Sequence, residues 1–146
     1  MFKILFYQEA LRNTLWIGPV VGTIHLLPSS GFLLFTAWQV KDMGASQFLT
    51  FLRTSPSFGL TLGYMSLVFA CAAALVICRF CFKNHPWSSL LVTYWSMAIL
   101  MVLMIQAPCC IIFPLDVFLF LRVRECYLAA RELIDLGFDL RNLPDY

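Results

Sequence analysis

Long uncharged stretches separated by short charged segments dominate the pattern of this chain. Runs without Lys, Arg, Asp or Glu cover 13–40, 54–78 and 84–115, and they contain 28, 25 and 32 residues. A helix needs about 20 largely apolar residues to cross the hydrocarbon core of a bilayer. The pattern therefore predicts one membrane-spanning helix in each of the first two runs.

The third run continues past a single acidic residue, Asp116, into apolar positions that end at Leu121. As one helix, the segment 84–121 would measure about 57 Å, nearly twice the thickness of a hydrocarbon core. Pro108 lies within this segment, and proline ends or bends a helix because it lacks the amide proton and disfavours helical geometry in the preceding residue. We therefore expect the chain to turn back near 106–110 and to form two spans here.

The distribution of Lys and Arg favours four spans over three. Four spans place eight of the ten basic residues on one side of the membrane and two on the other, whereas three spans divide them six to four. The side richer in basic residues normally faces the cytoplasm. We therefore predict an all-α, integral membrane four-helix bundle with both termini cytoplasmic, or on the matrix side in a mitochondrion.

The predicted organisation is a single membrane domain over 1–146. Its spans are expected at about 14–40, 57–78, 87–107 and 109–126. The last helix is expected to leave the membrane as a C-terminal amphipathic cytosolic stem over 122–137, with Gly137 as its C-cap, followed by a tail over 138–146.

Two segments lie outside these spans. The segment 42–58 is rich in Ser, Thr and Gly and is expected to be an external loop. The segment 2–11 has a mixed apolar and polar pattern, so it is expected either to extend the first span or to form a short amphipathic segment of its own.

Composition supports a membrane protein and excludes two other classes. Hydrophobic residues make up 61% of the chain and charged residues 12%, with a mean hydropathy of +0.82, whereas soluble domains carry about 25% charged residues. A net charge of +2 without a basic run gives a nucleic acid nothing to bind, and disorder needs far fewer aromatic residues. We expect a plasma membrane or endomembrane location rather than the mitochondrial inner membrane.

Two ionisable residues are predicted inside the spans, His25 and Asp116. Such groups are costly in lipid, by about 2.5–3.5 kcal/mol, and normally face a partner in the bundle. Counted along their helices, His25 lies about 13 Å and Asp116 about 10 Å from the outer boundary, so the two can meet. The pair is interpreted either as a polar clasp between helices or as a proton relay or cation site.

Small residues recur at four-residue spacing in the first two spans, and such spacing lets helix backbones approach closely. The expected packing positions are Gly18, Gly22, Gly59, Gly63, Ser66, Ala70 and Ala74. They are interpreted either as a face for a partner or as the contact between the two spans of this chain.

Cysteines near the cytoplasmic face are candidates for S-palmitoylation, namely Cys78, Cys81 and Cys126. With His85 they also have the composition of a zinc site, but the spacing is irregular and no metal site is predicted. Cys109 and Cys110 fall at the predicted outer corner.

No sequence motif of a catalytic triad, phosphate loop or metalloprotease occurs, so neither enzymatic activity nor a cofactor is expected. We expect an accessory, trafficking or structural subunit that contacts lipid and other membrane subunits, or a second copy. The stem is expected to bind a partner through one helical face, Val123, Tyr127, Ala130 and Ile134. The alternative is a small proton or ion channel, or a transporter component, that uses His25 and Asp116.

Overall fold

The computed structural model describes residues 2–106 and 112–142, and within these ranges it contains helices and no strands. The helices are α1 (Phe2–Thr14), α2 (Ile17–Val40), α3 (Ala45–Thr54), α4 (Pro56–Cys81), α5 (Pro86–Gln106), α6 (Ile112–Asp135) and the 3-10 turn η1 (Leu140–Asn142). The fold is all-helical, as predicted.

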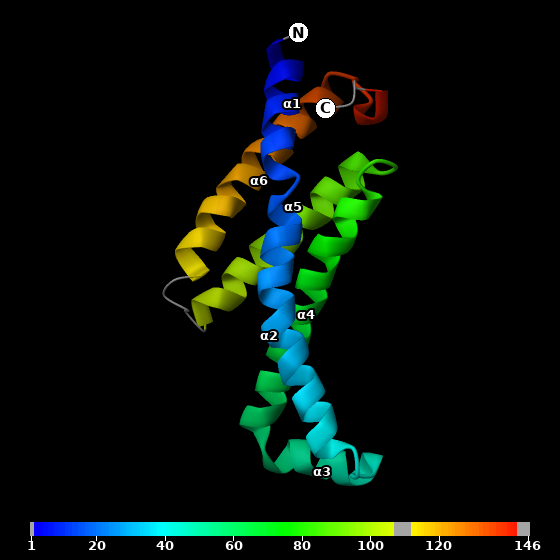
Figure 1. Cartoon of the computed structure of the whole chain (residues 1–146), viewed down its shortest axis with the longest axis vertical. Helices are drawn as coiled ribbons and strands as arrows, with labels where there is room; N and C mark the ends of the chain where they lie inside the picture. The colour runs from blue at the N-terminus through cyan, green and yellow to red at the C-terminus, as the bar shows by residue number, and fades with distance from the viewer. Residues whose placement is uncertain (1, 107–111, 143–146) are drawn as a thin grey trace.

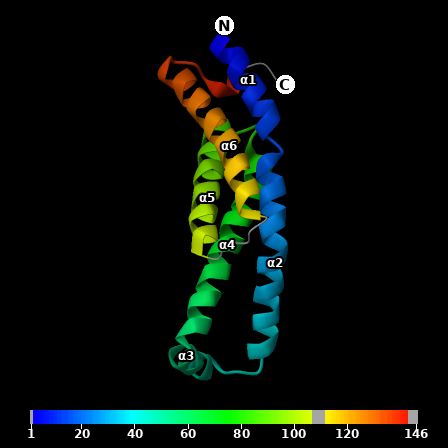
Figure 2. The ribbon, with the colours of Figure 1, turned by 90° about the vertical axis from the view of Figure 1, so that its left-hand side faces the viewer.

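The helices form an elongated bundle in which the chain repeatedly reverses direction (Figure 1). Helices α1 and α2 run almost end to end along the molecule, α3 lies across its far end, and α4 returns beside α2. Helices α5 and α6 run in opposite directions and pack against each other, so α1 and the end of α6 lie at the same end of the molecule (Figure 2). The predicted reversal between α5 and α6 is thus present, although its corner, 107–111, lies outside the described residues.

In the described part of the chain, three segments are long and apolar enough to cross a membrane: Ile4–Val40, Pro56–Cys81 and Pro86–Ile105. The predicted fourth span, 109–126, is not among them. Helix α6 carries Asp116, Arg122, Arg124 and Glu125 within its first fourteen residues, so its apolar beginning, Ile112–Leu121, would cover only about 15 Å as a helix.

Proline sets several of the helix boundaries. The ring of Pro19 would clash with the carbonyl of Leu15 in a continuous helix, and the helix is interrupted at Leu15 and Trp16, between α1 and α2. Pro56 and Pro86 are the first residues of α4 and α5, where the missing amide proton removes no helical hydrogen bond.

Helix α6 ends at a glycine, as predicted. Gly137 has φ +85, its amide donates to the carbonyl of Ile134 at 2.8 Å, and the amide of Phe138 donates to the carbonyl of Leu133 at 3.0 Å. These two bonds define a Schellman cap, which satisfies carbonyls that the helix leaves free. The predicted stem, 122–137, lies almost wholly within α6, in agreement with the expectation that the last helix continues into it.

Two clusters of buried apolar side chains hold the bundle together. The first joins α2, α4, α5 and α6, and consists of Ile17, Val21, Val68, Cys71, Leu75, Met97, Leu100, Leu119 and Val123. The second lies nearer the termini and joins α1 to α5, α6 and η1 through Tyr7, Leu11, Leu90, Cys126, Ala130, Leu133 and Leu140. Helix α1 is therefore more than an extension of the first span, because it packs along the charged half of α6.

The loop predicted over 42–58 is wrong, because Ala45–Thr54 forms helix α3. Ser, Thr and Gly in this segment suggested a loop, but its apolar residues recur at helical spacing on one side. Gly44 stands at the N-cap, and its amide donates to Oε1 of Gln47 at 3.2 Å.

Candidate functional site

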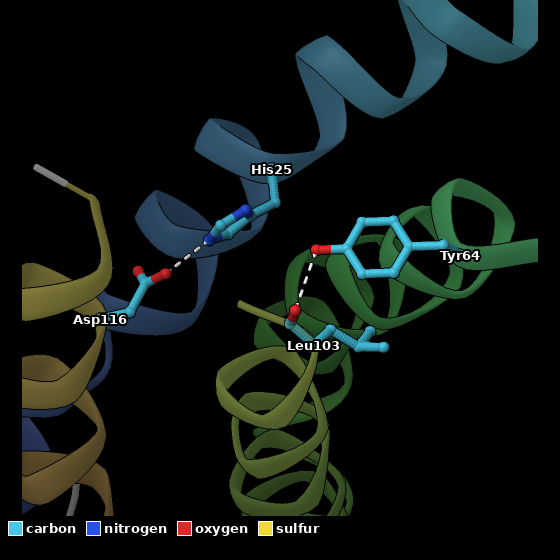
Figure 3. Close-up of polar contacts among 4 residues, drawn as sticks. All are labelled: His25, Tyr64, Leu103 and Asp116. Atoms are coloured by element: carbon cyan, nitrogen blue, oxygen red, sulfur yellow. Dashed lines mark hydrogen bonds and ion pairs between the residues drawn. The ribbon is translucent and has the colours of Figure 1, made fainter. Parts of the chain in front are cut away.

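The His25 and Asp116 side chains meet inside the bundle. Nε2 of His25 on α2 lies 2.8 Å from Oδ2 of Asp116 on α6, and the two residues are only 3% and 2% exposed (Figure 3). Sequence alone placed them at similar depths, and α6 packs against α5 in the orientation that turns Asp116 toward α2. The contact joins two residues that are 91 positions apart in the chain.

This contact contains one shared proton. Either the imidazole N–H donates to a carboxylate, or a protonated carboxyl donates to the imidazole nitrogen. The other carboxylate oxygen, Oδ1, is buried and has no hydrogen-bond partner among the described residues. A buried polar atom without a partner is costly, so the described residues leave this oxygen unsatisfied.

The backbone hydrogen bonds of α2 are altered close to His25. Pro28 removes one backbone hydrogen bond from α2, and the hydroxyl of Ser29 donates to the carbonyl of His25 at 2.6 Å. Ser29 is fully buried. The carbonyl that Pro28 leaves without its helical donor is that of Ile24, and the Ser29 hydroxyl adds a bond at the adjacent carbonyl, in the turn that carries the imidazole.

A second polar contact, between α4 and α5, was not predicted. The hydroxyl of Tyr64 donates to the backbone carbonyl of Leu103 at 3.1 Å (Figure 3). Tyr64 also packs at the edge of the first apolar cluster. Its position in an apolar run gives no sign of a partner, because a backbone carbonyl as acceptor leaves no trace in the sequence.

An aromatic stack joins α5 to α6 in the half of the bundle near the termini. Tyr94 and Tyr127 have ring centroids 4.5 Å apart and nearly parallel planes, Trp87 stacks on Tyr127 at 5.4 Å, and Phe120 stacks on Tyr94 at 5.4 Å. Trp87 and Tyr94, like Phe120 and Tyr127, are seven residues apart, which places each pair on one helical face. That spacing was the available signal, and it was missed.

The small residues of α2 form a close helix contact. A side chain at Gly22 would place its first carbon 2.8 Å from the carbonyl oxygen of Ala72 and 2.9 Å from a methyl of Val76, both on α4. Gly18 faces the carbonyl of Leu75 at a looser 3.4 Å. Gly18 and Gly22 therefore serve contact within the chain, as one of the two interpretations expected.

The small residues of α4 do not take part in that contact. Helix α4 packs on α2 through Val68, Cys71, Ala72 and Leu75, which are its buried residues. The small-residue stripe, defined here as Gly59, Gly63, Ser66, Ala70 and Ala74, lies on the other side of the helix. Gly63, Ser66 and Ala70 are exposed, and a side-chain carbon at Gly63 would have nothing within 4 Å. For this stripe, the interpretation as contact between the two spans is wrong.

The predicted partner face of the stem is largely covered from within the chain. Val123 and Ala130 are buried, and Tyr127 belongs to the aromatic stack. Helix α1 lies on this side of α6. Ile134 is 37% exposed, so of the four predicted residues it is the one most accessible to another molecule.

The candidate lipidation sites differ sharply in access. Cys81 is exposed, Cys78 is half-buried and Cys126 is fully buried in the second apolar cluster. Burial raises the pKa of the Cys126 thiol to about 11, so it is neither accessible nor ionised, and its assignment as a lipidation site is wrong. Cys109 and Cys110 lie outside the described residues.

Within residues 2–106 and 112–142, no group of three or more His, Cys, Asp and Glu side chains could hold a metal ion. Comparison of the chain with protein-family models, curated proteins and solved structures finds no match. Its function is therefore inferred from its own residues.

Proposed function

We propose that this chain is a non-enzymatic, multi-pass membrane protein that acts as a structural, trafficking or accessory subunit of a larger membrane assembly. The observation that carries the proposal is the exposed middle of the small-residue stripe of α4, Gly63, Ser66 and Ala70. Lipid chains gain little from a surface of Gly, Ser and Ala, whereas a second helix can approach its backbone closely. The stripe thus suits a transmembrane helix of another subunit or of a second copy.

The proposed topology has four membrane segments with both termini cytoplasmic, in the plasma membrane or an endomembrane. The charge distribution supports it. Lys41 and Arg53 lie at one end, just before α3 and in its last turn, whereas the other described basic residues lie in α1, around the C-terminal end of α4, in α6 beyond Leu121 and in η1, at the opposite end. The short apolar part of α6 would enter the membrane together with α5 as a hairpin. A protease added outside the cell should then reach the connection between α2 and α4 and neither terminus.

Substitution of Gly63 tests the proposed subunit role. Gly63→Leu should fill the stripe and displace a neighbouring helix, while Gly31→Leu is the matched control, because Gly31 is exposed and also has nothing within 4 Å. Tagged full-length chains would be extracted in mild detergent, and the co-purifying membrane proteins, including a second, differently tagged copy, would be quantified.

The proposal expects one or more stoichiometric partners to be retained by the wild type and by Gly31→Leu and to be lost from Gly63→Leu. Identical partner profiles in all three chains would contradict it. Circular dichroism and gel filtration would establish that both variants are folded.

A second candidate function is proton or cation movement through the His25 and Asp116 pair. The specific observation in its favour is the buried Oδ1 of Asp116 that has no partner among the described residues, since such an oxygen can accept a proton or coordinate a cation. Vesicles containing the purified chain and a pH-sensitive dye should show a proton flux that Asp116→Asn abolishes and Glu125→Gln, an exposed control on the same helix, leaves intact. Equal flux in empty vesicles would reject this candidate.

A further inference from the structure

Helix α3 is amphipathic, and its apolar face is only partly covered by the protein: Phe48, Phe51 and Leu52 are half-buried, whereas Leu49 is exposed. The apolar residues Phe48, Leu49, Phe51 and Leu52 occupy one side, whereas Ser46, Gln47, Thr50 and Arg53 occupy the other. None of its ten residues is buried, and Leu49 is 57% exposed. A short helix of this kind normally needs a surface to pack on.

The orientation of α3 follows from its contacts with α4. Phe51 packs edge-on against Phe58, with ring centroids 5.1 Å apart, and Leu52 is the nearest neighbour of Gly59. Because Phe58 and Gly59 belong to the first turn of α4, the apolar face of α3 is turned toward the side on which α2 and α4 extend. Helix α3 itself lies across the ends of these two helices (Figures 1 and 2).

Residues beside α3 have the character of a membrane boundary. Trp38, in the last turn of α2, is exposed, and Nζ of Lys41 lies 5.7 Å from its ring centroid. Tryptophan and lysine are enriched where the hydrocarbon core meets the headgroups. Fifteen residues, 41–55, separate α2 from α4, whereas antiparallel helices usually need 2–8 residues. The additional length is used to build α3 at this level.

We propose that α3 is an interfacial helix that lies in the headgroup layer, with its apolar face against the acyl chains of the leaflet at this end of the spans. The uncovered part of that face continues into the exposed apolar surfaces of α2 and α4, which include Leu34, Phe35 and Leu60. Lipid is therefore the occupant that the arrangement favours, because a single lipid bilayer would cover the apolar surfaces of all three helices. The inference rests on the assignment of α2 and α4 as spans.

The experiment places an environment-sensitive fluorescent amino acid at single positions of the full-length chain in lipid nanodiscs. Phe48 lies on the apolar face, and Thr50 lies on the opposite, polar face. Leu27, in the middle of α2 and 69% exposed, reports whether that helix is in lipid. Each probe is tested with lipids brominated high on the acyl chain, with lipids brominated near the chain end, and with aqueous iodide.

The inference expects the Phe48 probe to be blue-shifted and quenched by bromine high on the chain, and the Thr50 probe to be quenched by iodide alone. Quenching of Leu27 by the deeper bromine, with no lipid quenching at Phe48, would overturn the inference and leave the membrane assignment intact. Loss of lipid quenching at Leu27 would overturn both. A Phe48 probe that neither lipid nor iodide reaches would also overturn it, because protein would then cover the face.

Discussion

Two motifs with the same spacing have opposite surroundings in this chain. Gly18 and Gly22 on α2 lie against the backbone of α4, and Gly22 leaves no room for a side-chain carbon. Gly63 on α4 has the same four-residue relation to Gly59, yet a side-chain carbon at Gly63 would have nothing within 4 Å. A small-residue repeat therefore identifies a helix face on which another helix can pack closely. It does not identify which helix packs there.

Cysteines and charged pairs show the same contrast between buried and exposed positions. Cys126 is buried while Cys81 is exposed, and the His25 and Asp116 pair is buried while the Arg122 and Glu125 pair is about half exposed on each side chain. Matched substitutions at covered and uncovered positions can therefore measure how much each contact contributes.

The largest effect is expected at the α2–α4 contact. Gly22→Leu inserts a branched side chain where the carbonyl of Ala72 lies 2.8 Å from the first added carbon, and should destabilise the fold by about 3 kcal/mol. Gly63→Leu should change the free energy of unfolding by less than about 0.5 kcal/mol. Unfolding in mixed detergent micelles with increasing dodecyl sulfate, followed by circular dichroism, measures both.

A similar loss of stability in the two variants would show that the stripe on α4 is covered in the isolated chain. Gly18→Ala provides an internal scale, because its added carbon would lie 3.4 Å from the carbonyl of Leu75, a contact that a small relaxation accommodates.

The next effect concerns the reactivity of the two cysteines. The pKa of about 11 at Cys126, compared with an ordinary 9.0, lowers its thiolate fraction at neutral pH roughly 100-fold, and burial slows reagent access further. A water-soluble maleimide should label exposed Cys81 far faster, as peptide mass spectrometry would show. The labelling rate of Cys126 should rise with pH up to about pH 11, because the thiolate is the nucleophile. Equal labelling rates for Cys126 and Cys81 at pH 7 would contradict the buried position of Cys126.

A smaller effect is expected from breaking the buried polar pair. Asp116→Ala leaves His25 without its partner and should destabilise the fold by about 2 kcal/mol. Glu125→Ala removes an exposed partner 3.4 Å from Arg122 and should cost less than about 0.5 kcal/mol. The same unfolding assay compares them, and a double variant with His25→Ala should recover part of the loss if the two residues act through each other.

The smallest effect is expected at the α4–α5 contact. Tyr64→Phe removes the hydroxyl that donates to Leu103 but keeps the ring in its cluster, so it should cost about 0.6 kcal/mol, the average for a hydrogen bond between membrane helices. A loss several times larger would mean that the hydroxyl sets the register of the two helices.

Much of the fold could be predicted from the sequence, because membrane-spanning helices depend on length and apolarity. The first three predicted spans, 14–40, 57–78 and 87–107, lie within a few residues of α2, α4 and α5, and the predicted cap at Gly137 is present. The interruption at Leu15 and Trp16 was not predicted, although Pro19 is its physical cause. Helix α3 was missed because polar composition was given more weight than the spacing of four apolar residues.

Only the ionisable residues of the candidate site could be predicted, because the free-energy cost of an ionisable side chain in lipid makes such a residue stand out in an apolar segment. His25 and Asp116 are ionisable residues within apolar segments, and their similar depths in the predicted spans indicated that they could meet. Pairing of Tyr64 with a backbone carbonyl was invisible, and so was the burial of Cys126, because residue type does not record which neighbour covers a side chain. The packing of α1 on α6, at Cys126, Ala130 and Leu133 of the stem, arises from the tertiary fold alone.

The separation of His25 and Asp116 along the chain has a consequence for biosynthesis. His25 and Asp116 are 91 positions apart in the chain, so the ribosome has made α2, α3, α4 and α5 before the carboxyl that pairs with the imidazole exists. Until then the nascent protein holds a polar ring in its first long helix without its final partner. A chain that ends before residue 116 therefore keeps the free-energy cost of an ionisable side chain in lipid without the partner that offsets it.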